Sequence, residues 1–74
     1  MKALSTFTSD CGSKKAVIRI SKETLVVDFY HNGQRIGEIE YPNYSYPYVR
    51  DAADNWVTGV MTEETIQKYS QFAA

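Results

Sequence analysis

The stretch from Tyr46 to Met61 constrains the fold of this chain more than any other part of the sequence. Its apolar residues recur at a helical period and include the only tryptophan: Val49, Ala53, Trp56 and Val60. This spacing places them on one stripe of a helix whose other side is polar. Ser45 can cap the helix start and Pro47 is tolerated in its first turn. An amphipathic helix needs a second layer to cover its stripe, so we expect the preceding chain to supply one.

Three segments before this helix alternate apolar and polar residues as half-buried strands do. They are Lys15 to Ile20, Thr24 to Tyr30 and Gln34 to Tyr41. The polar run between the first two predicts a turn, and one register places all the alternating apolar residues on a single face. That register pairs Ile20 with Leu25, Ile18 with Val27 and Ala16 with Phe29.

The segment His31-Asn32-Gly33 is a hairpin signal, and its turn decides which side of the third strand is buried. A two-residue turn would place two glutamates on the core face. Buried unpaired carboxylates cost several kcal/mol, and a slip of one residue exchanges the two faces. We therefore predict a three-residue loop with Gly33 at positive φ, which pairs Tyr30 with Gln34. Gly37, Ile39 and Tyr41 then face the core, and Glu38 and Glu40 face solvent.

A second helix start is indicated at Thr62-Glu63-Glu64, followed by a sparse apolar stripe of Ile66, Tyr69 and Ala73. The predicted fold is α+β: a three-stranded antiparallel meander packed on one main helix, with a short C-terminal helix (β-β-β-α-α). Residues 14–74 form the single domain. Residues 1–13, rich in Ser and Thr, are expected to be a flexible N-terminal arm or to add a short extra strand.

Composition argues for a small cytoplasmic protein. The chain has 74 residues, a formal net charge of −1 and a single cysteine, Cys11. One cysteine cannot form an intrachain disulfide, which favours a reducing compartment. The N-terminus lacks the apolar core of a signal peptide, and no apolar run approaches the length of a membrane span.

Residues suited to catalysis are sparse, so we do not expect an enzyme. The only histidine, His31, falls in a hairpin loop, and Asp51 and Asp54 lie on the polar face of the main helix. The four glycines are scattered and form no phosphate-binding loop. One histidine and one cysteine make a zinc site improbable, and no cofactor is expected.

Nucleic-acid binding is the alternative function. The segment His-Asn-Gly-Gln-Arg-Ile-Gly and the later Tyr…Ala-Ala-x-x-Trp helix resemble phage-integrase arm-binding and plant AP2-type domains over residues 15–58. That resemblance implies DNA recognition by the outer face of a three-stranded sheet. On this chain the face would carry Lys15 and Arg19 against Asp28, Glu38 and Glu40, a balance that opposes phosphate binding.

Protein binding is the function that the sequence favours. The outer sheet face is predicted to expose a group of apolar residues, and the segment before the helix carries three tyrosines suited to a binding surface. The candidate partner-binding residues are Val17, Val26, Tyr30, Ile36, Tyr44, Tyr46 and Tyr48. The same surface, or an edge strand of the sheet, could instead mediate self-association of this chain.

The run Tyr48-Val-Arg-Asp-Ala-Ala-Asp-Asn-Trp-Val-Thr-Gly-Val resembles small uncharacterised proteins of tailed bacteriophages, particularly phages of marine cyanobacteria. The resemblance covers the main helix and carries no catalytic residues. It implies a protein of the host cytoplasm that acts as a modulator or inhibitor by binding a host or phage protein.

Overall fold

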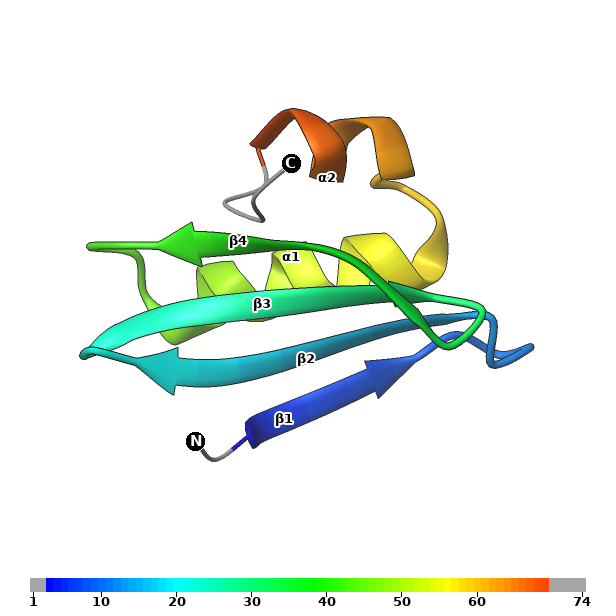
Figure 1. The fold of residues 1–74 in the computed structure, drawn as a ribbon. Coiled ribbons are helices and arrows are strands. Elements are labelled where there is room, and N and C mark those ends of the chain that lie inside the picture. The colour runs from blue at the N-terminus through cyan, green and yellow to red at the C-terminus, as the bar shows by residue number, and fades with distance from the viewer. Residues whose placement is uncertain (1–2, 70–74) are drawn as a thin grey trace.

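The sheet has four strands, and both helices lie against one of its faces (Figure 1). The computed structural model describes residues 3–69. The strands follow one another across the sheet in chain order, each antiparallel to the next. The elements are β1 (Ala3–Thr8), β2 (Lys14–Ser21), β3 (Thr24–His31), β4 (Gln34–Tyr41), α1 (Tyr46–Thr58) and α2 (Glu63–Tyr69). Neither helix is long and apolar enough, within residues 3–69, to cross a membrane.

The prediction of a three-stranded sheet is corrected by β1, which comes from the segment expected to be an arm. This strand pairs with β2 at the edge of the sheet, with Phe7 opposite Ala16 and Ser5 opposite Ile18. Phe7 packs against the core from there. The apolar pattern of the strand is weak because Ser5 occupies the core-facing position before Phe7 and the exposed Thr6 and Thr8 alternate with them, so the segment resembles a polar loop.

The hairpin of β2 and β3 has the predicted register. Ile18 lies opposite Val27 and Ala16 opposite Phe29, and all four side chains are buried. Lys22 and Glu23 form the two-residue turn, with φ of 51° and 65°. Positive φ at both central residues fits a turn that matches the twist of the two strands. Ile20, at the end of β2, is 46% exposed rather than buried as its position on the core face suggested.

The hairpin of β3 and β4 buries the predicted side of β4, but its register differs from the predicted one. His31 pairs with Gln34, so the turn holds two residues, and Gly33 has positive φ (84°) as predicted. A β-bulge next to the turn leaves Ile36 as the extra residue of β4, because Tyr30 pairs with Arg35 but Phe29 with Gly37. The predicted pairing of Tyr30 with Gln34 is therefore wrong by one residue. Since an inserted residue exchanges the faces again, the bulge still directs Ile39 and Tyr41 to the core.

The helix α1 begins where its sequence signals lie and ends earlier than its stripe suggested. Ser45 is the N-cap residue, although its hydroxyl makes no capping hydrogen bond, and a proline stands in the first turn. Gly59 ends the helix at φ 91°, and its N–H donates to the Trp56 carbonyl. Val60 falls beyond this cap and is 73% exposed, so it does not belong to the buried stripe.

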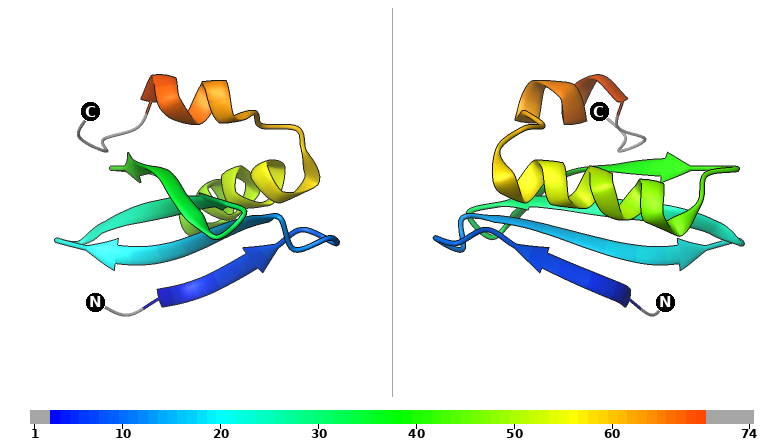
Figure 2. Two further views of the ribbon diagram at one scale, coloured as in Figure 1. Left: turned by 45° about the vertical axis from the view of Figure 1, so that its right-hand side comes forward. Right: turned by 180° about the vertical axis from the view of Figure 1, so that it is seen from behind.

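The core is built between the sheet and the two helices. The right-hand view of Figure 2, seen from behind, shows α1 lying on the sheet roughly along the strands and α2 on the side of β4. α1 packs on β1, β2 and β3, and α2 packs on β4. The buried residues of the core are Ala16, Ile18, Val27, Phe29, Ile39, Tyr41, Val49, Ala52, Ala53, Trp56 and Ile66. Ala73, expected on the stripe of the second helix, lies outside the described residues.

Trp56 is buried as predicted, with 1% of its surface exposed. Its ring meets Phe29 and His31 edge to face, with centroids 6.1 Å apart in both pairs. The indole N–H donates to the carbonyl of Tyr30 at 3.2 Å, and the Lys14 ammonium lies 4.6 Å from the ring centroid. Trp56 thus holds α1 over the turn end of β3.

Candidate functional site

Three tyrosines come together where β4 ends and α1 begins. Tyr44 and Tyr48 stack with ring centroids 4.5 Å apart and an interplanar angle of 19°. Tyr41 meets both of them edge to face, at 5.9 Å and 6.2 Å. Tyr44 is 51% and Tyr48 52% exposed, whereas Tyr41 is 9% exposed. A buried ring therefore supports two exposed rings.

The local sequence explains why these rings meet. Pro42 cannot donate a hydrogen bond to continue the sheet, and Asn43 adopts a φ of 66°, which reverses the chain. Helix α1 begins two residues after Tyr44. Tyr48 then stands in its first turn, four residues beyond Tyr44. The turn and the helix start together bring both rings over the end of β4.

A groove adjoins this cluster on the side of α2, and we call it the tyrosine groove. It encloses about 400 Å³. Its lining residues are Ile39, Glu40, Tyr41, Tyr44, Tyr48, Met61, Thr65 and Tyr69. A second hollow of about 280 Å³ shares Tyr41, Tyr48 and Met61 with it and continues along α1 past Asp51 and Asn55. The first volume falls within the range of ligand-binding clefts, and its lining is largely aromatic and apolar.

The charged residues that line the two hollows are acidic. They are Glu40 and Asp51, and none of the described lining residues is lysine or arginine. Burial raises the pKa of Tyr41 to about 12, with smaller contributions from Tyr48 and Tyr44. The Tyr41 phenol therefore stays protonated at physiological pH and can donate a hydrogen bond. Lys68 of α2 brings a cation close to one lining ring, since its ammonium lies 5.5 Å from the Tyr69 ring centroid.

Tyr46, predicted with Tyr44 and Tyr48, lies apart from them. It is half-buried against the core, and its hydroxyl shares a hydrogen bond with the Ser5 hydroxyl of β1. Its spacing to Val49 and Ala53, three and seven residues, already places it on the buried stripe of α1. Tyr46 therefore tethers the edge strand to the helix.

The outer sheet face does not carry the apolar patch predicted from its sequence. Val26 is 1% exposed, and Val17 and Tyr30 are half-buried. Ile36 packs against the core because of the bulge, rather than standing on the outer face. The Lys15 ammonium lies 4.7 Å from the centroid of the Tyr30 ring. Charged side chains, not aliphatic ones, dominate what this face presents.

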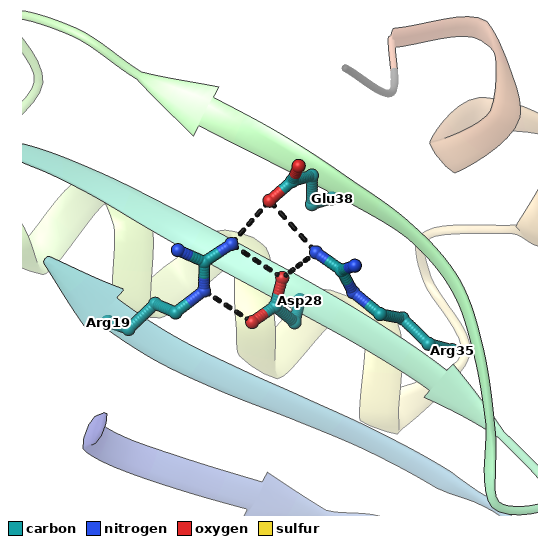
Figure 3. A network of polar contacts seen from close by, with 4 residues as sticks. All are labelled: Arg19, Asp28, Arg35 and Glu38. Carbon is teal, nitrogen blue, oxygen red and sulfur yellow. Dashed lines mark hydrogen bonds and ion pairs between the residues drawn. The ribbon is translucent and has the colours of Figure 1, made fainter. Parts of the chain in front are cut away.

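A network of two arginines and two carboxylates occupies the centre of that face (Figure 3). Asp28 of β3, 6% exposed, accepts hydrogen bonds from Arg19 Nε at 2.6 Å and from Arg35 at 2.7 Å. Glu38 of β4 pairs with the same two guanidinium groups. Burial raises the pKa of Asp28, but the bonds to Arg19 and Arg35 outweigh it and hold that pKa below its ordinary value of 3.8.

The network changes the charge balance expected for the face. The predicted pairing of Tyr30 with Gln34 would place Arg35 opposite Phe29 on the core face, which leaves a net charge of −1 on the outer face. The bulge places Arg35 opposite Tyr30 and within the network. Lys15, Arg19 and Arg35 now balance Asp28, Glu38 and Glu40, so the formal charge of this face is zero.

Groups with chemical reactivity are isolated from one another. Cys11, exposed in the turn between β1 and β2, has its pKa lowered to about 7, chiefly by a hydrogen bond to Ser13. His31 Nδ1 lies 3.6 Å from Glu63 and edge-on to Trp56. Within residues 3–69, no three His, Cys, Asp or Glu side chains gather to hold a metal ion.

Sequence reasoning found two of the exposed tyrosines and missed the rest of the groove. Tyr41 was correctly assigned to the core face, but nothing linked it to Tyr69 or Met61. Those residues come from separate elements, and only the packing of α2 on β4 brings them together. Comparison with protein-family models, curated proteins and solved structures gave no match, so the site is interpreted from its own geometry.

Proposed function

We propose that this chain is a small non-catalytic protein-binding domain whose contact site is the tyrosine groove. The stacked and half-exposed pair of Tyr44 and Tyr48 at the mouth of the groove carries the proposal. Tyrosine offers large amphipathic area and loses little side-chain entropy when it is immobilised. The stacking and the buried Tyr41 beneath preorganise both rings, which lowers the cost of binding further. Two exposed rings kept together in this way offer a partner a contiguous aromatic surface, and tyrosine is a frequent hot-spot residue of interfaces.

The kind of partner follows from the resemblance of the α1 sequence to small phage proteins. On that basis the domain is a phage-encoded modulator or inhibitor, and it acts in the host cytoplasm on a host or phage protein. Such a domain needs no catalytic residues, since occupying a surface of the partner is enough. A standard interface uses about 800 Å² per partner, a small fraction of the 4898 Å² that this chain exposes.

Nucleic-acid binding by the outer sheet face is the weaker alternative. Its two arginines are engaged by Asp28 and Glu38, so neutralising phosphates would first require breaking these ion pairs. The zero formal charge of the face provides little counterion release. A salt series with duplex DNA tests it: steep loss of affinity with salt would support this alternative, and no binding at low salt would eliminate it.

Site-specific photocrosslinking tests the proposed function. Tyr44 is replaced by p-benzoylphenylalanine in the cells that make the protein, and Tyr30 on the outer face is replaced in the same way as the matched control. We expect a discrete protein adduct from position 44 and none from position 30. An adduct formed only from position 30 would contradict the proposal, as would the absence of any adduct from position 44 in a correctly folded chain.

A further inference from the structure

The tyrosine groove combines aromatic faces with an acidic residue, a combination that suits a positively charged ligand. Four tyrosines line the larger hollow, and Asp51 of α1 lines the smaller one. Building on the proposed function, we infer that the groove binds a basic side chain, Arg or Lys, of an extended segment of the partner protein, next to an apolar residue of that segment.

Cations are attracted to the faces of aromatic rings, and this chain shows the contact three times among its described residues. The ammonium groups of Lys14, Lys15 and Lys68 lie 4.6 to 5.5 Å from the ring centroids of Trp56, Tyr30 and Tyr69. In the stacked pair, each ring covers only one face of the other. The remaining faces of Tyr44 and Tyr48 offer the same kind of contact to a cation supplied from outside.

The charge of Asp51 favours a cationic ligand. Asp51 is exposed, so it attracts a cation through solvent and contributes modestly, whereas strand alternation directs the side chain of Glu40 to the outer sheet face. An anionic ligand would face Asp51 with no lysine or arginine among the described lining residues to offset it. This charge complementarity favours a basic peptide over a nucleic-acid strand, although the tyrosine rings could stack on bases.

The shape of the site favours a peptide over a small ammonium ion. The two hollows, of about 400 and 280 Å³, share Tyr41, Tyr48 and Met61 and therefore adjoin each other. Ile39 and Met61 give the larger hollow an apolar wall. A peptide could place its basic side chain against Tyr44 and Tyr48 and an apolar neighbour against that wall.

A displayed library of short linear peptides, selected on the intact chain, tests the inference. We expect peptides that need Tyr44 and Tyr48 to carry Arg or Lys beside an apolar residue. Replacing that Arg by citrulline, or Lys by norleucine, should weaken binding by about tenfold. Asp51→Asn should weaken it about threefold. The matched control is Asp10→Asn, in the turn at the opposite end of the sheet, and it should leave affinity unchanged.

The contrary outcomes separate this inference from the function on which it rests. Peptides that require Tyr44 and Tyr48 but tolerate citrulline or norleucine would overturn the basic ligand and leave a protein-binding groove. Peptides that bind equally well to the Tyr44→Ala, Tyr48→Ala double variant would overturn the groove itself. An oligothymidine strand or tetramethylammonium that binds the groove more tightly than every selected peptide would assign it to a different occupant. Circular dichroism checks that each variant is folded.

Discussion

Removing the carboxylate of Asp28 should destabilise the fold far more than removing an exposed aspartate. Asp28 is 6% exposed and accepts three charge-assisted hydrogen bonds, two from Arg19 and one from Arg35. Breaking a buried ion pair by deleting one partner costs about 3–5 kcal/mol. Arg35 is 34% exposed and regains some hydration, and Glu38 still pairs with both arginines. We therefore expect Asp28→Ala to cost about 3 kcal/mol.

Urea unfolding followed by far-ultraviolet circular dichroism measures this cost, provided that the slope against urea is unchanged. Asp54→Ala is the control because Asp54 is exposed on α1 and forms no ion pair within residues 3–69, and it should stay within about 0.5 kcal/mol of the parent. A loss below about 1 kcal/mol for Asp28→Ala would refute the reasoning. The network would then behave as a solvated surface ion pair.

The same carboxylate predicts a pH dependence with a definite sign. The pKa of Asp28 in the folded chain lies below 3.8 because the hydrogen bonds from its arginines outweigh its burial. Its stabilisation is therefore fully present above about pH 4 and is lost as pH falls through the lowered pKa. Asp28→Asn should lack this portion of the acid loss. Identical slopes of stability against pH in both proteins below pH 4 would contradict it.

Two further substitutions test the core and the bulge. Trp56→Ala should cost about 3–5 kcal/mol of unfolding free energy and lower the melting temperature by more than about 12 °C. Trp56→Phe loses mainly the hydrogen bond to the Tyr30 carbonyl and should cost less. Equal losses for the two variants in a thermal melt would contradict the buried, hydrogen-bonded position of Trp56. Ile36→Asp should destabilise by about 2–4 kcal/mol, because the bulge packs this side chain against the core. A near-intact melting temperature for Ile36→Asp would instead place Ile36 on the outer face.

Much of the fold was predictable because short-range patterns carry it. The alternation in β2 and β3 gave the correct register, since a single pairing places every apolar residue on one face. The helical period identified Trp56 and the buried side of α1. The predictions that were wrong concern the edge strand and the helix end. β1 has few apolar residues and was not included in the predicted three-stranded sheet, and Val60 follows the helix period but lies beyond the Gly59 cap.

The second hairpin shows why the correct faces could follow from an incorrect register. Keeping Glu38 and Glu40 out of the core requires one extra residue somewhere between β3 and β4. Sequence reasoning placed it in the loop, because a three-residue loop is the local solution. The chain keeps the Asn32-Gly33 turn at two residues and inserts Ile36 within β4 instead. The sequence indicated that one extra residue is needed, but the position of that residue depends on how Ile36 packs.

The sequence by itself therefore determined the fold class and the buried faces of β2, β3 and α1, because these follow from periods of two and 3.6 residues. Only the tertiary structure decided which distant side chains meet. It separated Tyr46 from the other tyrosines, joined Tyr41 and Tyr69 in one groove, and brought Arg35 into the network of Asp28. Those contacts depend on a bulge and on the docking of α2, and neither leaves a period in the sequence.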